Sequence, residues 1–519
     1  MSEKRLTEPE RKTLVEYDVD VAVVGGGTAG CVAAIAAART GASTVLIERF
    51  GSLGGCPTVG RCAHIGNRFI DSQMRRVIDG IPVEIMTRIV NEGGTNFPTL
   101  EETIYGKTAP PVHILVDPEI MAVVLMEMVE EAGVKLMLHT YFCDPVMEGD
   151  QIKGVVVQNK SGRKAVLAKT VVDASGEADV AFSAGVPCSS NPEAPTIASS
   201  YGLLLRMGNV DQERFMEYVL NLPVGQPDPD FAEWLSKHVD SPLEELKKHA
   251  YWKFFLDPQP VDEGMPRNHP GKARLSSESM EWYREKWVAD REFAFVEMHL
   301  FRHKIREAVE NGDLEGYRPV GETGMIAFNF DGVTGGMWRQ REVIVNAVTA
   351  IGFDAFDSDQ ISKVEVASRR RALEVSRFMK KYIPGFENAY IVDTGAQTMP
   401  RHIRIIEAEN SLNQSHRQSI DGQDETAFVA TYGHIPGIAH KIPYGMMVPK
   451  RIGNLLVAGK SADGAIKVRD IPDMMNMGQA AGTAAALSSQ KGISPGQLDI
   501  KELQKVLKEQ HVILDIPAA

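Results

Sequence analysis

Two cysteines, Cys56 and Cys62, lie in the glycine-rich stretch LGGCPTVGRC that spans residues 53–62. Two thiols this close along the chain can cycle between a dithiol and a disulfide beside a redox cofactor. Disulfide geometry is strict, but Pro57 and Gly60 indicate a loop that can fold back and bring the thiols together. The alternative is a turn whose backbone passes close to a cofactor and in which the cysteines are incidental. Both interpretations stay open at this point.

Just upstream, the segment VVGGGTAG contains Gly25, Gly27 and Gly30 in the pattern G-x-G-x-x-G. The apolar residues 18–24 before it predict a buried strand, and the alanine-rich residues 29–41 after it predict a helix. In such a strand–turn–helix unit the first glycine makes a tight turn, the second lets backbone approach a pyrophosphate, and the third packs helix on strand. The pattern therefore predicts nucleotide binding.

Glu48 strengthens this interpretation. It ends a second predicted strand, residues 43–48, and follows Gly30 by 18 residues. A carboxylate there can accept hydrogen bonds from ribose hydroxyls. Strand, helix, second strand and acidic end together predict a dinucleotide site, but they do not separate NAD from FAD.

Further polar residues are candidates for proton transfer or for binding a substrate anion. The segment MPRHIRIIEAE offers Arg401, His402 and Arg404, and arginine presents a planar fork of donors to carboxylates. Another loop, TYGHIPGIAHKIPYG, places three polar rings close together: Tyr432, His434 and His440. His64 could also face a cofactor. We expect no metal site, because no pair of histidines or cysteines at ligand spacing has a partner pair.

The surrounding elements suggest one domain interrupted by another. After residue 440 the sequence predicts a buried strand (GNLLVAGK) and a helix of small residues that ends at Gly492. This order of a buried strand and a small-residue helix resembles that of the N-terminal part. All five tryptophans lie between residues 189 and 340. We therefore predict a first domain from residues 1–188 and 431–519, with residues 189–430 inserted as a mixed α/β cap on the substrate side. The basic run ASRRRALEVSRFMKK is expected to be the solvated face of a helix.

Composition limits the class of protein. The chain has 519 residues, 43% of them hydrophobic, and a formal net charge of -13. An acidic balance argues against nucleic acid or an anionic membrane as a partner. The charged N-terminus does not resemble a secretory signal. The glycines of residues 25–27 interrupt the one stretch that could span a membrane. Five cysteines are too few for a secreted disulfide framework. We expect a cytoplasmic protein.

Four blocks of the sequence resemble FAD-dependent oxidoreductases distantly related to the flavoprotein subunits of fumarate reductase and succinate dehydrogenase. The blocks are DVAVVGGGTAGCVAAIAAARTGASTVLIERFGSLGG, TVVDASGEADVAFSAG, IPGFENAYIVDTGAQTMPRHIRIIEAE and IPYGMMVPKRIGNLLVAGKSADGA with MGQAAGTAAAL. The resemblance implies an α/β fold with a parallel-sheet, Rossmann-like FAD domain of the glutathione-reductase type.

Carried over residue by residue, the resemblance implies contacts with FAD at two ends of the chain. Gly478 and Gln479 are expected to start a helix whose positive end faces the flavin. His402 replaces the glutamate usual in the family, which leaves the general base undetermined, and in some flavoproteins a histidine near the position of His64 carries the flavin covalently. The implied cofactor-binding residues are Gly25, Gly27, Thr28, Ala29, Gly30, Glu48, Arg49, Gly54, Gly55, Cys56, Gly176, Gly459, Asp463, Gly478 and Gln479.

These observations predict an FAD-dependent oxidoreductase that transfers a hydride between a carbon centre of a small organic substrate and flavin N5. The catalytic candidates are Arg401, His402, Tyr432, His434 and His440. One alternative is a pyridine-nucleotide disulfide-type reductase that uses Cys56 and Cys62. Against it, the spacing is C-x5-C where those enzymes have C-x4-C, and no second glycine fingerprint follows. The other alternative is a flavin-binding scaffold without turnover. The electron acceptor and the oligomeric state, which could be a homo-oligomer, are left open.

Overall fold

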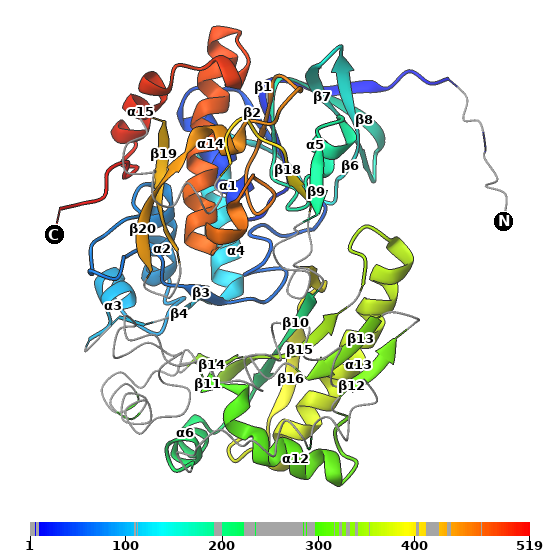
Figure 1. Ribbon diagram of the computed structural model, residues 1–519, viewed down its shortest axis with the longest axis vertical. Coiled ribbons are helices and arrows are strands. Elements are labelled where there is room, and N and C mark those ends of the chain that lie inside the picture. Colours follow the sequence, from blue (N-terminus) through cyan, green and yellow to red (C-terminus); the bar gives the residue numbers. More distant parts are fainter. Residues whose placement is uncertain are drawn as a thin grey trace.

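The computed structural model describes residues 6, 10–107, 110–111, 113–190, 200–222, 234, 284, 287, 296–315, 317–320, 324–328, 333–337, 341–351, 353–400, 404–411, 425–432, 437–468 and 470–518. These residues form two bodies, each built around a sheet (Figure 1). The upper body in this view contains both ends of the chain, and the lower body contains β10 to β16 and α13.

The sheet of the upper body is mostly parallel. Strands β1, β2, β5, β8 and β21 run parallel to one another, whereas β7 pairs antiparallel with β8 and β6 pairs antiparallel with β7. The strands are β5 (Lys135–Met137), β2 (Thr44–Ile47), β1 (Leu14–Val24), β8 (Gly162–Asp173), β7 (Gln151–Asn159) and β6 (Tyr141–Glu148) in spatial order, with β21 (Leu455–Val457) also paired to β8. The late strand β21 thus brings the C-terminal segment into the sheet that contains β1.

Side chains on the two faces of β1 enter different cores, as the alternation of a strand requires. Val21 and Val23 pack with the helices α1 (Thr28–Arg39) and α14 (Ile471–Lys491), while Ala22 and Val24 belong to a second cluster on the other face. The other helices of this body are α2 (Ile81–Asn91), α3 (Leu100–Tyr105), α4 (Pro118–Glu131), α5 (Asp179–Ser183) and α15 (Ile500–Glu509), with the 3-10 turns η5 (Tyr444–Met447), η6 (Ala465–Val468) and η7 (Pro495–Gln497).

The lower body has an antiparallel sheet covered by the long helix α13 (Ser358–Tyr382). Trp234 and Trp287 are buried in its apolar core; the other three tryptophans lie outside the described residues. Its strands are β10 (Ser200–Gly208), β11 (Val296–Glu297), β12 (Tyr317–Val320), β13 (Gly324–Phe328), β14 (Val333–Met337), β15 (Glu342–Ile351), β16 (Tyr390–Thr394) and β17 (Met399–Pro400), and its remaining helical elements are α6 (Gln212–Leu220), η1 (Met298–Phe301) and α12 (Arg302–Glu310).

Three short antiparallel pairs complete the described structure. They are β3 (His64–Gly66) with β4 (His113–Leu115), β9 (Cys188–Ser190) with β18 (Arg404–Ile406), and β19 (Thr426–Tyr432) with β20 (Ile438–Pro443).

Two sequence-based expectations are wrong in part. Helix α14 starts at Ile471, seven positions before Gly478, so Gly478 and Gln479 do not begin it. The basic run of α13 is not wholly solvated, because Arg371 is fully buried, where its guanidinium donates to the carbonyl of Glu315 and pairs with Glu374 at 3.0 Å. Arg369 and Arg370, by contrast, are exposed as expected.

Candidate cofactor site

The turn between β1 and α1 accepts only glycine at two of its positions. Gly25 has a φ of +105°, and a Cβ there would lie 2.3 Å from the carbonyl oxygen of Ala174. A Cβ on Gly30 would lie 1.8 Å from the carbonyl oxygen of Gly25. The backbone of α1 therefore starts in direct contact with the ends of β1 and β8, as the spacing of the glycines predicts.

Open space lies in front of the N-terminus of α1. Gly27 is its N-cap, no side chain caps the helix, and the first turn holds no acidic residue. A Cβ on Gly27 would meet nothing within 4 Å, although the next residues, Thr28 and Ala29, are buried. Uncapped N–H groups together with the positive end of the helix dipole form a site for an anion such as a pyrophosphate.

Glu48 lies beside this helix end, buried with 7% of its surface exposed. One of its carboxylate oxygens accepts a hydrogen bond from the amide of Gly26 at 2.6 Å, and the other accepts from the amide of Phe50 at 2.8 Å. Burial raises the pKa of Glu48, while these backbone donors act in the opposite direction. A carboxylate oxygen has more than one lone pair, so each can accept a hydroxyl in addition. The neighbouring Arg49 is exposed and donates to Gln397.

The glycine pair after Glu48 packs directly on the turn. The amide of Gly54 donates to the carbonyl of Gly26 at 2.8 Å, and Gly54 pairs with Gly27 as an isolated parallel bridge. A Cβ on Gly55 would lie 3.0 Å from the Cα of Gly27. The chain therefore passes close to the open end of α1.

Two segments far apart in the sequence lie close to these elements. Gly459, with a φ of +107°, donates its amide to the sulfur of Met477 at 3.2 Å, and a Cβ on it would come within 3.8 Å of the Cβ of Ala29. The carbonyl of Gly176 accepts a hydrogen bond from Ser461 at 3.0 Å. Glycines from four segments of the chain thus surround the N-terminus of α1.

Asp463 is already engaged within the protein. One of its carboxylate oxygens accepts a hydrogen bond from the hydroxyl of Ser411 at 2.7 Å, and its amide donates to the carbonyl of Met446 at 3.1 Å. Asp463 therefore joins the segment after β21 to the segment after β18, whatever else it contacts.

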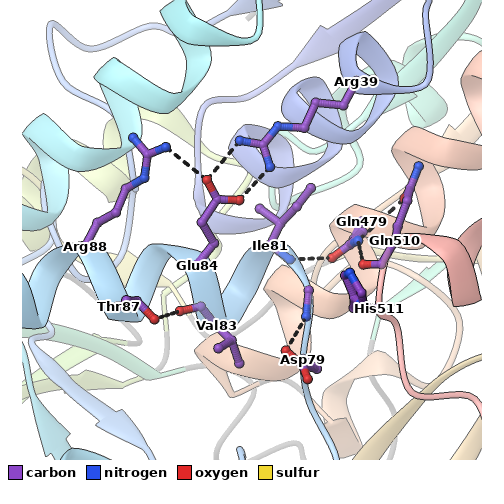
Figure 2. Close-up of a pocket in the computed structure, with 11 residues that line it drawn as sticks. Arg39, Asp79, Ile81, Val83, Glu84, Thr87, Arg88, Gln479, Gln510 and His511 are labelled. Atoms are coloured by element: carbon purple, nitrogen blue, oxygen red, sulfur yellow. Dashed lines mark hydrogen bonds and ion pairs between the residues drawn. The ribbon is translucent and has the colours of Figure 1, made fainter. Parts of the chain in front are cut away.

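Gly478 and Gln479 have structural roles in the middle of α14. A Cβ on Gly478 would lie 2.2 Å from the carbonyl oxygen of Ala29, so this glycine allows α14 to cross α1. Figure 2 shows the buried amide of Gln479 between Ile81 and Gln510, where it accepts from the amide of Ile81 at 2.9 Å and donates to the carbonyl of Gln510 at 3.2 Å. It lines a cavity of about 650 Å³ beside the N-terminus of α2.

The cysteine-containing loop folds back on itself. The amide of Cys62 donates to the carbonyl of Cys56 at 3.0 Å. The Cys56 sulfur is exposed and lies 3.2 Å from the sulfur of Met399, which belongs to the lower body. Cys62 is half-buried, and all five cysteines of the chain are thiols rather than disulfides in this structure. Spacing alone could not decide whether the loop closes; the structure shows that its backbone does.

The predicted catalytic residues are not brought together by the described part of the chain. Arg401, His402 and His434 lie outside the described residues. Tyr432 ends β19, and His440 is half-buried on β20 opposite Ala430. Their roles stay predictions.

His64 is buried on β3, and neither of its ring nitrogens has a hydrogen-bond partner in the described structure. Burial, helped by the nearby His113, lowers the pKa of its imidazole to about 3. His64 is therefore neutral over the physiological range. A neutral imidazole offers one donor and one acceptor but no positive charge.

Sequence reasoning missed a polar group next to Gly176. Glu177 is largely buried, which raises the pKa of its carboxyl, and the ammonium of Lys460 lies 3.9 Å from it. Lys460 also donates to the carbonyl of Pro400 at 2.8 Å. The signal was present, since Glu177 and Lys460 directly follow Gly176 and Gly459.

Two further kinds of site are not seen. In the part of the chain that the structure describes, no three histidine, cysteine or acidic side chains gather as a metal would need. Across the same ranges, no helix is long and apolar enough to cross a membrane.

Comparison with known sequences places the chain in a family. Residues 20–507 match the family described as FAD dependent oxidoreductase, and the chain belongs to this family. It is therefore an FAD-dependent enzyme. The site fits this cofactor. Open space lies in front of Gly27, the N-terminus of α1 has no side-chain cap, and the carboxylate of Glu48 lies beside it.

Curated relatives match only part of the chain. A digeranylgeranylglycerophospholipid reductase from Methanoculleus marisnigri is 31% identical over 175 residues, which is 33% of this chain and 42% of the relative. A thiamine thiazole synthase from Methanococcus maripaludis is 30% identical over 167 residues, 31% of this chain and 56% of that protein. The matched segments thus span 42% and 56% of the length of these two relatives.

Solved structures resemble the chain over most of its length but only weakly. A geranylgeranyl bacteriochlorophyll reductase-like protein from Thermoplasma acidophilum has a TM-score of 0.41 at 14% identity, covering 96% of this chain and 84% of the other. L-proline dehydrogenase from P. horikoshii has a TM-score of 0.39 at 14% identity, covering 96% and 100%.

Proposed function

We propose that this enzyme transfers a hydride between a carbon centre of a small organic substrate and N5 of its FAD. FAD, when bound, would supply the group that accepts or donates the hydride. The observation that carries the proposal is the open, uncapped end of α1, ringed by glycines and accompanied by the buried Glu48. The glutathione-reductase type of FAD domain and the distant relation to fumarate reductase flavoproteins stay predictions.

In this proposal the protein holds FAD through backbone and carboxylate groups. Gly27, Thr28 and Ala29 would bind the pyrophosphate through their amides, and Glu48 would bind the ribose hydroxyls. Gly55 and Gly459 leave room for the chain of the cofactor, since a side chain at either position would project toward Gly27 or Ala29. The positive end of α14 belongs to Ile471 and the residues just after it rather than to Gly478.

The substrate class rests on partial similarity. Several matching relatives are named digeranylgeranylglycerophospholipid reductase. We therefore include reduction of a carbon–carbon double bond, together with oxidation of alcohols and amines, among the candidate reactions. Because the match covers at most about half of those proteins, we do not assign their substrate to this chain.

Anaerobic flavin spectroscopy tests the proposal. Purified protein should be yellow and should release FAD on denaturation. A panel of alcohols, amines and saturated acids should include a compound that bleaches the bound flavin, or a panel of enoates one that reoxidises the reduced flavin. If no carbon substrate changes the flavin while a small disulfide reoxidises it catalytically with NAD(P)H, the disulfide-reductase alternative holds. Protein that binds FAD but never turns over would favour the scaffold.

Arg401 is the residue we propose to bind a substrate carboxylate or a developing oxyanion. Its predecessor, Pro400, accepts a hydrogen bond from Lys460, whose neighbour Gly459 lies beside Ala29. Removing such a donor costs about 2.7–4 kcal/mol, or roughly a hundredfold to a thousandfold in rate. Arg401→Ala should slow flavin reduction per bound FAD by that factor, and Arg401→Lys should fall between. The exposed Arg370→Ala is the control, and an unchanged rate per FAD in Arg401→Ala would remove this role.

A further inference from the structure

The loop after Gly55 closes through two backbone hydrogen bonds. The amide of Gly60 donates to the carbonyl of Gly55 at 3.0 Å, and the amide of Cys62 donates to that of Cys56, also at 3.0 Å. Backbone N–H···O=C bonds of this length join residues whose Cα atoms lie on the order of 5–6 Å apart, in helices and in sheets alike. A disulfide needs Cα atoms about 4.4–6.8 Å apart. The contact between Cys56 and Cys62 therefore brings their backbones into the range that a disulfide requires.

Neighbouring residues hold the loop in this shape. The hydroxyl of Thr58 donates to the carbonyl of Leu53 at 2.5 Å. Arg61, just before Cys62, has a φ of +59°, which turns the chain back. Its guanidinium is held by Glu119 at 2.7 Å and by Asp393 at 3.1 Å. The approach of the two cysteines is thus part of an anchored loop, not of a free one.

We propose that Cys56 and Cys62 form a thiol–disulfide exchange site, whose substrates are small-molecule disulfides. This proposal does not depend on the reaction proposed above for the flavin. It also differs from a catalytic dithiol that passes electrons to the flavin, because the oxidant is the small disulfide itself.

The two thiols differ in accessibility, and this difference assigns their order. Cys56 is exposed, and its sulfur rests against the thioether of Met399, a soft and adaptable contact. Cys62 is half-buried and packs against the apolar core of the upper body. Cys56 therefore meets the small disulfide first, and Cys62 attacks second.

The exchange balances in two steps. The Cys56 thiolate attacks one sulfur of the small disulfide; a mixed disulfide forms and the first small thiolate leaves. The Cys62 thiolate then attacks the Cys56 sulfur, so that the protein disulfide forms and the second small thiolate leaves. The protein loses two electrons and two protons, and the two small thiols gain them.

The other three cysteines are poorly suited to this reaction. Burial raises the pKa of the Cys31 thiol to about 12 and that of Cys188 to about 11, and it also raises the pKa of Cys143. A thiol with a raised pKa holds little of the reactive thiolate at neutral pH. These three lie on α1, β9 and β6, away from the loop in sequence, and they serve as internal controls.

Oxidised glutathione added to the reduced holoenzyme tests the proposal. After incubation, the protein is unfolded in denaturant that already contains the alkylating agent, so that every remaining thiol is alkylated; the protein is then digested, and each cysteine is assigned by mass spectrometry. We expect a Cys56–Cys62 disulfide without a glutathione adduct, while Cys31, Cys143 and Cys188 are alkylated. Because this mapping uses the wild-type chain, it does not depend on whether any variant folds.

Three variants test the order of attack. Cys62→Ser should stop at the first step and carry one glutathione on Cys56. Cys56→Ser should carry none, because its remaining loop thiol is half-buried. Cys188→Ser should behave as the wild type. The proposal is overturned if wild-type Cys56 and Cys62 both remain alkylatable, if the glutathione settles on another cysteine, or if Cys56→Ser is modified as fast as Cys62→Ser.

Discussion

At the scale of single residues, the first turns of α14 contain two buried acceptors without donors. Asp473 and Asn476 are fully buried, and one side-chain oxygen of each has no hydrogen-bond partner in the described structure. They stand three positions apart on one helix, where side chains meet. Burial raises the pKa of Asp473 well above its usual range, although the nearby Arg68 acts against this and Asp470 adds to it. Protonation turns the unpartnered oxygen of Asp473 into a donor, and we predict that the oxygen of Asn476 accepts this proton's hydrogen bond.

Asp473 should therefore make folding depend on pH. Because its folded pKa is raised, its stabilising effect is complete at acid pH and is lost as pH rises above the ordinary range of an aspartate. Each unit of pH in that window lowers the unfolding free energy by about 1.4 kcal/mol for this group. Asp473→Asn, which cannot ionise, should lack this part of the slope.

The measurement compares urea unfolding at pH 5 and pH 7. The stability lost between the two pH values should be smaller in Asp473→Asn than in the wild type. Asp359→Asn, in the exposed first turn of α13, is the control and should keep the wild-type slope. An unchanged slope in Asp473→Asn would show that Asp473 is ionised in the folded protein.

At the scale of elements, the crossing of α1 and α14 supports the cofactor site. Gly478 and Gly482 lie one turn apart, and Cβ atoms on them would come within 2.2 Å of the Ala29 carbonyl and 2.0 Å of the Ala33 carbonyl. Small residues on both helices allow this approach. Because Ala29 belongs to the first turn of α1, the position of α14 also fixes the N-terminus that faces the open space.

Gly482→Ala should separate these helices. Overpacking of a tight contact costs about 1–3 kcal/mol. We expect a lower melting temperature and a lower FAD content at purification, because α1 shifts with its partner. Gly202→Ala on β10, where a Cβ would meet nothing within 4 Å, is the matched control and should keep both. A Gly482→Ala protein with wild-type melting temperature and FAD content would contradict this role.

Sequence reasoning predicted elements better than side-chain roles, for physical reasons. The glycine turn, β1, α1 and β2 could be predicted because hydrophobic periodicity and steric demands are local. The start of α14 was missed, although Asp470 before Ile471 and Pro472 is a helix-start signal. Arg371 could not be recognised as buried, because its partner, the Glu315 carbonyl, comes from a distant part of the chain. Whether Cys62 reaches Cys56 likewise depended on the fold of the loop.

At the scale of the whole molecule, two sets of contacts join the upper and lower bodies. Asp393 on β16 pairs with Arg61 of the cysteine loop at 3.1 Å, while Arg206 of β10, in the same lower sheet as Asp393, holds that carboxylate at 2.7 Å. Arg404 lies between two aromatic rings, 4.1 Å from the centre of the Phe182 ring and 3.9 Å from that of Phe356. The first joins the lower sheet to the loop after Gly55, and the second joins the segment before α13 to α5 of the upper body.

Arg404 therefore stabilises the interface between the two bodies. Its replacement should let the bodies unfold separately. Its guanidinium stacks on Phe182 of α5 and on Phe356 just before α13, and it pairs with Asp179 at 3.1 Å. Arg404→Lys keeps the charge but loses the flat surface that stacks on both rings.

Each cation–π contact is worth about 0.5–2 kcal/mol, so we expect a loss of about 1–4 kcal/mol of coupling. In differential scanning calorimetry the first transition should move to lower temperature and separate from the second. Arg370→Lys, on the exposed side of α13, should leave the profile as it is. If Arg404→Lys unfolds in the same single transition as the wild type, the bodies are held together by the Asp393–Arg61 pair and by apolar contact instead.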